Sequence, residues 1–141
     1  MTAKEYLKQL WWIDKEIHEK MMEQEWLKTK AEGTSPPEVT GMPRSAGGKD
    51  KISSVIIKMV DLQNYIKMRT DELIDLRITI TKQINGLEDQ RSRIVLSCRY
   101  LRRMKWEQIE KEMAYEKSSI MRMHRKALKE FEKKYPAIRS L

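Results

Sequence analysis

Residues 105–131, KWEQIEKEMAYEKSSIMRMHRKALKEF, contain two apolar helical patterns separated by a short break. In the first pattern, Trp106, Ile109 and Met113 recur at spacings of three and four residues, as on the buried side of a helix. The second pattern follows Ala114 and Tyr115, and its apolar members are Ile120, Met123, Ala127, Leu128 and Phe131. The stretch predicts a helix-turn-helix, with helices at about 106–114 and 118–135 and with Ser118 or Ser119 as the second N-cap.

The outer side of the second predicted helix is basic. At about 100° per residue, the side opposite its apolar stripe collects Ser118, Arg122, Arg125, Lys126, Lys129 and Lys133. No acidic residue interrupts this side, because Glu130 and Glu132 lie towards its flanks. Charged rows also occur on surfaces that meet only solvent, but an unbroken basic row favours double-stranded DNA as the ligand.

A helix-turn-helix predicts a role for each group of side chains. The first turns of its second helix reach base edges in the major groove, where arginine is the commonest reader of guanine. Base reading is therefore predicted for Ser118, Ser119, Met121, Arg122 and Arg125. Phosphate contacts are predicted for Arg99, Arg102, Arg103, Lys105, Lys126, Lys129 and Lys133. The predicted core contains Trp106, Ile109, Met113, Ile120, Met123 and Leu128, with His124 as a packed structural residue.

The distribution of charge agrees with a polyanion site at this end of the chain. The formal net charge is +8 over 141 residues, and residues 87–141 carry fifteen basic and eight acidic side chains. Residues 1–31 are balanced, with six of each sign. Because phosphate binding needs cations that lie together, this excess predicts a binding module joined to a part with a different task.

Two long helices are predicted upstream of this module. Seven of the nine Gly and Pro residues fall between Gly33 and Gly48, which leaves about 2–31 and 50–85 free of helix breakers. Thr2 and Glu5 have the spacing of a capping box.

The second long helix has an apolar heptad repeat from Ile52 to Leu87 that needs a partner helix. We expect an antiparallel hairpin over residues 1–85, with a flexible linker at 32–49 and Arg69 and Gln83 as polar register marks. Because a second copy can share the seam, we also expect a homodimer or a higher homo-oligomer.

The remaining segment predicts an all-α fold. Gly86 is expected to end the long helix as a C′ glycine, and a shorter helix follows at about 88–102. No stretch alternates β-branched and polar residues as a strand does. The predicted architecture is a long, coiled-coil-like helical hairpin followed by a three-helix module over residues 87–141.

Residue types exclude several classes of protein. Cys98 is the single cysteine and His18 and His124 are the two histidines, so we expect neither a disulfide nor a structural zinc site. We expect no enzyme activity and no cofactor, because the sequence offers no glycine-rich phosphate loop and no nucleophile with a base. Charged residues near the start and short apolar runs argue against a signal peptide and a membrane span, so a cytoplasmic location is expected.

The run RIVLSCRYLRRMKWEQIEKEMAYEKSSIMRMHRKAL, residues 93–128, resembles region 4 of sigma-70-type factors. A Tyr-Leu pair, a Trp-x-x-Ile and a late Ala-Leu recur there at these spacings, whereas Glu110 and Ala114 replace a usual alanine and a usual turn glycine. Together with the opening MTAKEYL and the heptad helix, the run resembles small phage and prophage proteins of Gram-positive bacteria related to autolysin-regulator-like late transcriptional regulators. The resemblance implies control of phage transcription by a DNA-binding protein.

Two other functions remain open on the sequence. A DNA-packaging component such as a small terminase subunit also joins a DNA-binding module to helices that build oligomers. A sigma-like adaptor would instead bind RNA polymerase, with weak affinity for DNA. The oligomeric state would separate the first of these from a dimeric regulator, and a variant of Arg122 would separate the second.

Overall fold

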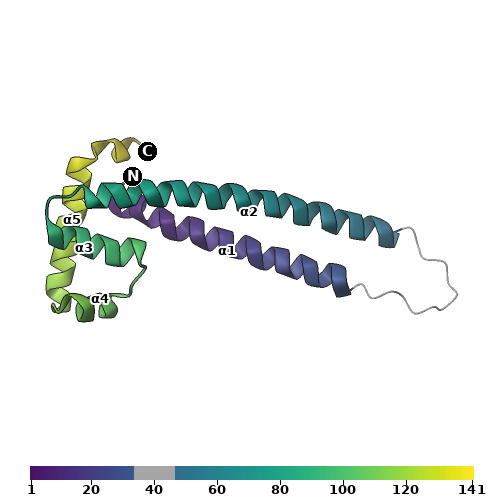
Figure 1. The fold of residues 1–141 in the computed structure, drawn as a ribbon, viewed down its shortest axis with the longest axis horizontal. Helices are drawn as coiled ribbons and strands as arrows, with labels where there is room; N and C mark the ends of the chain where they lie inside the picture. The colour runs from purple at the N-terminus through teal and green to yellow at the C-terminus, as the bar shows by residue number, and fades with distance from the viewer. Residues whose placement is uncertain (34–46) are drawn as a thin grey trace. The chain divides into compact units, whose positions relative to one another are not determined.

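The computed structural model describes residues 1–33 and 47–141, and all of the regular structure in these ranges is helical. The predicted all-α fold is therefore confirmed (Figure 1). The elements are α1 (Ala3–Gly33), α2 (Gly47–Asn85), α3 (Gln90–Leu96), the π-helical turn η1 (Ser97–Leu101), α4 (Trp106–Met113), α5 (Lys117–Lys134) and the 3-10 helix η2 (Pro136–Ser140). Residues 34–46, most of the predicted linker 32–49, lie outside the described residues.

The chain divides into two compact units. Residues 1–13 and 72–141 form one, called here the C-terminal unit, and residues 14–71 form the other, called the hairpin unit. α1 and α2 contribute to both units. The sequence analysis placed a boundary at 85–87, whereas the C-terminal unit also contains the start of α1 and the end of α2.

α1 begins with the capping box that the sequence predicted. The Glu5 backbone N–H donates to Thr2 Oγ1 at 3.2 Å, and the Thr2 N–H donates to a Glu5 carboxylate oxygen at 3.1 Å. Two N–H groups that no helical carbonyl can reach are thereby satisfied. The start of α1 is fixed locally, by side chains three residues apart.

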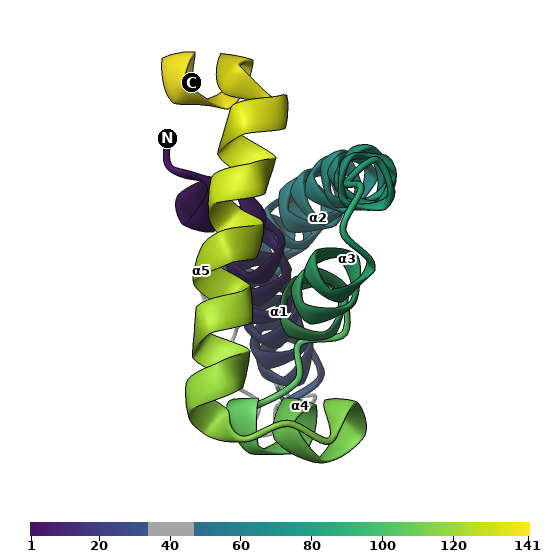
Figure 2. The same cartoon turned by 90° about the vertical axis from the view of Figure 1, so that its left-hand side faces the viewer.

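The core of the C-terminal unit joins helices that are distant in sequence (Figure 2). Its buried apolar residues are Ala3, Tyr6, Leu7 and Leu10 of α1, Ile80 and Ile84 of α2, Leu87, Val95 and Leu96 around α3, Cys98 and Tyr100 of η1, Ile109 of α4, Ile120, Ala127 and Phe131 of α5, and Ile138 of η2. Full burial of a large apolar side chain stabilises the fold by about 1.5–3 kcal/mol. α1 is therefore a part of the core that holds α5.

In the hairpin unit, α1 and α2 lie antiparallel. Arg69 Nη2 lies 3.0 Å from Glu16 Oε2, and the Tyr65 hydroxyl donates to the other oxygen of the same carboxylate. Arg69, predicted as a polar register mark, thus pairs α2 with α1 of its own chain. Ile17 and Leu27 are the buried apolar side chains among the described residues of this unit.

The junction after α2 corrects one prediction. Gly86 follows the helix, but its φ does not lie in the left-handed region, so it is not a C′ glycine of that kind. Glycine is needed here for space, because a Cβ on Gly86 would collide with the Tyr135 hydroxyl, which donates to the Gln83 carbonyl at 2.7 Å. Asp89 then N-caps α3 by accepting from the Arg91 N–H at 2.9 Å.

Candidate nucleic-acid interface

α4 and α5 are joined by a turn that places an alanine in a left-handed conformation. Ala114 has φ 57° and ψ 43°, and the N–H groups of Ala114 and Tyr115 both donate to the Glu110 carbonyl. Glu116 is extended and α5 begins at Lys117, so the predicted N-cap at Ser118 or Ser119 is wrong. Because the chain turns into the helix two residues earlier, both serines lie in the first turn of α5.

The inner side of α5 packs into the core of the C-terminal unit. Of the predicted core residues, Ile109 and Ile120 are fully buried, and the others are partly buried against the core, namely Trp106, Met113, Met123 and Leu128. Ala127 and Phe131, which belong to the same predicted apolar stripe, are also fully buried. α5 is therefore held along about three turns, from Ile120 to Phe131, by a continuous apolar side.

His124 is a packed structural residue, as predicted, with only 6% of its surface exposed. Its Nε2 lies 2.7 Å from the Tyr100 hydroxyl, and the Trp106 ring meets it edge-on with centroids 4.8 Å apart. Burial, together with the nearby charges of Lys4, Arg99, Arg125 and Lys8, lowers the pKa of His124 to about 4. The imidazole is neutral at physiological pH and serves to hold α5 against η1.

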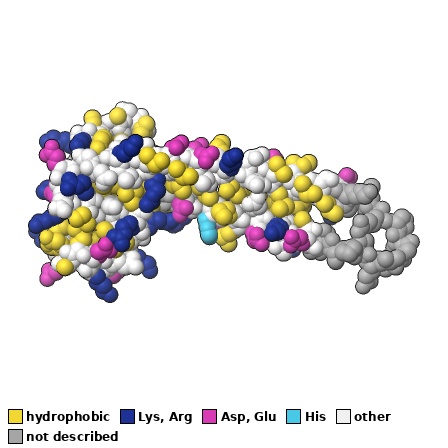
Figure 3. All heavy atoms as spheres, in the orientation of Figure 1, with side chains coloured by type: hydrophobic (Ala, Val, Ile, Leu, Met, Phe, Trp, Pro, Cys, Tyr) yellow, Lys and Arg dark blue, Asp and Glu magenta, His cyan; other side chains and the backbone are white. Residues whose placement is uncertain are grey.

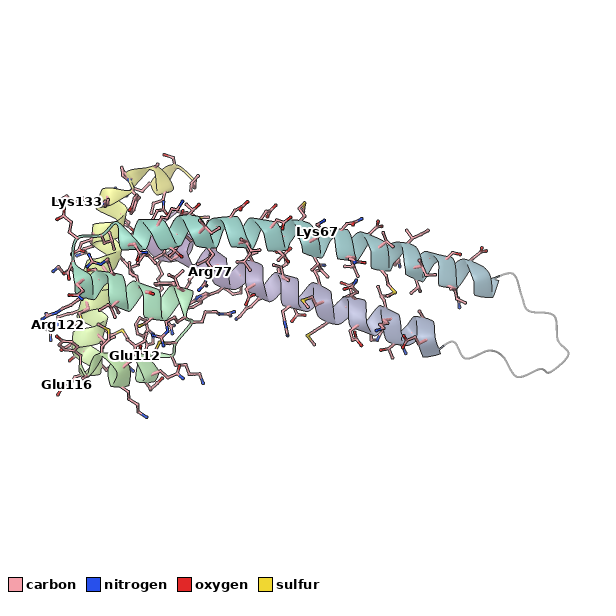
Figure 4. All side chains as sticks on the ribbon, in the orientation of Figure 1. Lys67, Arg77, Glu112, Glu116, Arg122 and Lys133 are labelled. Atoms are coloured by element: carbon pink, nitrogen blue, oxygen red, sulfur yellow. The ribbon has the colours of Figure 1, made fainter. Side chains whose placement is uncertain are left out.

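The outer side of α5 is exposed and basic (Figures 3 and 4). Ser118 and the charged residues Arg122, Arg125, Lys126, Lys129 and Lys133 are all exposed, while Ser119 and Met121 are partly exposed at its edges. Figure 4 shows Arg122 and Lys133 at the outer edge of α5, pointing away from the core. Within the part of the chain that the structure describes, no ion pair engages Arg122, Arg125, Lys129 or Lys133. Their charges are available to an external anion.

Lys126 differs from these four residues. Its Nζ lies 2.9 Å from Asp89 Oδ2 and 3.8 Å from a Glu130 carboxylate oxygen. The hydrogen bond with Asp89 raises the pKa of Lys126 and lowers that of Asp89. Lys126 therefore ties α5 to the start of α3, and it offers less charge to a phosphate than its neighbours do.

Arg99, predicted to contact phosphate, is engaged inside the unit instead. Its guanidinium carbon lies 4.3 Å from the Trp106 ring centroid and 4.8 Å from that of Trp11, and Nη1 donates to the Met104 carbonyl at 2.9 Å. Burial lowers the pKa of Arg99. Because the rings of Trp11 and Trp106 and the Met104 carbonyl already hold this side chain, Arg99 is not placed to contact a phosphate.

The other three residues ahead of α4 are exposed. Arg102 forms an ion pair with Glu112 at 2.5 Å, which raises the pKa of Arg102. Arg103 has φ 54°, in the left-handed region. Lys105 N-caps α4, with its backbone N–H donating to the Gln108 side chain at 2.9 Å. Arg103 and Lys105 lie at the entrance to the helix-turn-helix, and their phosphate contacts stay a prediction.

The sequence patterns did not predict that Trp11 and the first turns of α1 pack into the core of the C-terminal unit. The Trp11 Nε1–H donates to the Tyr100 carbonyl at 3.2 Å, and its ring stacks on Tyr100 with centroids 5.4 Å apart. The sequence held a signal for this contact, because the apolar residues of α1 form two adjacent rows, with Ala3, Leu7 and Trp11 in one and Tyr6, Leu10 and Ile17 in the other. A helix with two apolar rows packs against two neighbours.

The described residues contain no group of His, Cys, Asp and Glu side chains that could hold a metal ion. Among the helices that the structure describes, none is long and apolar enough to cross a bilayer.

The fold and the site define a class of protein: an all-α chain whose last helices form a helix-turn-helix with a basic outer side. A family model described as "Protein of unknown function (DUF1492)" matches residues 34–132, and the chain belongs to this family. The matched region contains α2 and ends within α5, so it includes the turn at Ala114 and both arginines of the outer side. No curated protein and no solved structure matches the chain.

Proposed function

We propose that this protein is a sequence-specific, double-stranded DNA-binding regulator of transcription, of the type that phages and prophages encode. The observation that carries the proposal is the outer side of α5, where four exposed basic side chains meet no acidic partner in the described chain. A row of cations on one helix, opposite a side that is locked into a core, is the arrangement with which a recognition helix enters the major groove.

The position of each side chain along α5 suggests its task. Ser118, Arg122 and Arg125 lie in the first half of the helix, where side chains reach base edges, and a bidentate arginine contact discriminates guanine by about 1–3 kcal/mol. Lys129 and Lys133 lie further along and meet the phosphates. Arg103 and Lys105 add phosphate contacts at the start of α4.

We further propose that two copies bind together through the hairpin unit. Six of its large apolar side chains are each more than half exposed, namely Met21, Met22, Trp26, Ile56, Ile57 and Val60. Solvent contact of this extent is unfavourable, and a second hairpin would cover part of it. Two modules would then address two half-sites related by symmetry.

The test is selection of genomic DNA fragments by the purified chain at about 150 mM salt, since salt weakens purely electrostatic binding. The double variant Arg122→Ala/Arg125→Ala is compared with Lys28→Gln/Lys67→Gln, which removes two exposed charges from the hairpin unit. We expect a recurrent, symmetric motif that only the first variant loses.

Each contrary outcome has a defined meaning. Binding without a recurrent motif contradicts sequence-specific regulation and favours a role in DNA packaging, for which a ring-shaped oligomer would be the further sign. Absence of binding contradicts the DNA-binding proposal and favours an adaptor that contacts RNA polymerase.

A further inference from the structure

The first turns of α1 lie beside α5, although a linker and a second long helix separate them in sequence. The Ala3 backbone N–H donates to Glu132 Oε1 at 2.9 Å, and the Tyr6 and Phe131 rings lie 5.9 Å apart. Ala3 and Leu7 are fully buried in the shared core. The flank of α5 that carries Glu132 therefore faces the N-terminal segment of the chain.

The first turns of α1 carry two lysines on one face. Lys4, Lys8 and Trp11 share one face of α1, because they are four and three residues apart. Lys8 Nζ lies 5.7 Å from the Trp11 ring, which also contacts Arg99, and Lys4 is exposed. Lys4, Lys8 and Arg125 all act on the buried His124 and contribute to the low pKa of that residue. The start of α1 lies on the side of α5 away from α3 (Figure 2), where the Ala3 N–H reaches Glu132.

Acidic side chains in this segment are already bonded. Glu5 accepts from the Thr2 N–H in the capping box, and Glu132 accepts from Ala3 and lies 3.5 Å from Arg139 Nη2. The hydrogen bonds that Glu132 accepts from Ala3 and Arg139 lower the pKa of Glu132. Within the described residues, no ion pair engages Lys4 or Lys8.

We propose that Lys4 and Lys8 bind the phosphate backbone of double-stranded DNA that α5 enters, so that the interface includes the N-terminal segment as well as the helix-turn-helix. The inference rests on the proposed function. A helix in the major groove is flanked by a phosphate backbone on each side. Arg91 and the paired Lys126 lie where α5 meets the start of α3, and the first turns of α1, which carry Lys4 and Lys8, pack against α5 on its other side. The two lysines supply the second flank.

The experiment measures binding of a short mixed-sequence duplex by fluorescence anisotropy over a range of salt concentrations. The variant Lys4→Gln/Lys8→Gln is compared with Lys28→Gln/Lys67→Gln, which removes the same charge from the hairpin unit. Each phosphate contact contributes about 0.9 to the slope of log Kd against log salt, so the first variant should lose about 1.8 of slope and bind roughly 30-fold more weakly near 0.15 M. The control should keep the slope.

A variant that keeps both charges, Lys4→Arg/Lys8→Arg, should bind like the unchanged protein, and thermal unfolding of all variants verifies that the fold is intact. If Lys4→Gln/Lys8→Gln keeps the slope of the control while Arg122→Ala/Arg125→Ala loses binding, the inference is overturned and the proposed function stands. If the unchanged protein binds no duplex at any salt concentration, both are overturned.

Discussion

Arg99 gives the sharpest test of the structure, because the sequence and the fold assign it different roles. Its guanidinium lies between the rings of Trp11 and Trp106 at 4.8 and 4.3 Å and donates to the Met104 carbonyl. Each cation–π contact is worth about 0.5–2 kcal/mol, and a hydrogen bond from a charged donor about 1.5–3 kcal/mol. Replacement by methionine, which fills the space without charge, should therefore lower the free energy of unfolding by about 3 kcal/mol.

Thermal and urea unfolding measure this loss, which corresponds to a fall of roughly 10–15 °C in Tm for a domain of this size. Arg99→Lys serves as a matched variant, because it keeps the charge but lacks the flat surface that stacks between two rings. We expect it to be destabilised as well. In the anisotropy assay, Arg99→Met should leave the salt slope unchanged at a temperature where the protein is folded. Unchanged stability together with a slope reduced by about 0.9 would refute the structural role and restore the phosphate contact.

Four further predictions follow from single contacts. Ala114→Gly should stabilise the fold by about 0.5–1 kcal/mol in urea titrations, because glycine adopts φ 57° without the strain that a Cβ brings; a loss of stability would contradict the assigned turn. Because burial lowers the pKa of His124 from 6.5 to about 4, stability is complete above pH 6.5 and falls by about 3 kcal/mol as the pH drops to 4; urea titrations should show this loss, and His124→Gln should flatten it. Gly86→Ala should cost about 1–3 kcal/mol through the clash with Tyr135, and adding Tyr135→Phe should recover part of it; equal stability of Gly86→Ala and the unchanged chain would show that the junction has room for a Cβ. A fragment of residues 87–141 should lack cooperative thermal unfolding, because it loses the four buried α1 residues of the core. Their burial contributes roughly 6 kcal/mol, whereas the free energy of unfolding of a whole domain is typically about 5–15 kcal/mol. A sharp transition would show that the module folds alone.

Local patterns predicted most of the helices and their faces. The heptad repeat, the absence of Gly and Pro and the Thr2–Glu5 pair gave α1 and α2, because these signals depend on residues three or four apart. The exposed basic side of α5 and its buried side also agree with the prediction, since helix geometry alone sets which side chains share a face.

The errors lie where the backbone leaves regular geometry or where distant segments meet. The N-cap of α5 falls at Glu116, which has no capping side chain, so composition gave no signal for it. Gly86 follows the helix as expected, but for a different reason: the constraint comes from Tyr135, about fifty residues later.

By itself, the sequence determined that the chain is helical, where the long helices break and which side of α5 carries charge, because each of these depends on neighbours within one or two turns. Only the tertiary structure decided that the first turns of α1 belong to the core beneath α5. It likewise decided that Arg99 is held between two tryptophans, and that the start of α1, which carries Lys4 and Lys8, packs against α5. These placements depend on packing between segments tens of residues apart, and no periodicity within one segment specifies which distant surface will bury it.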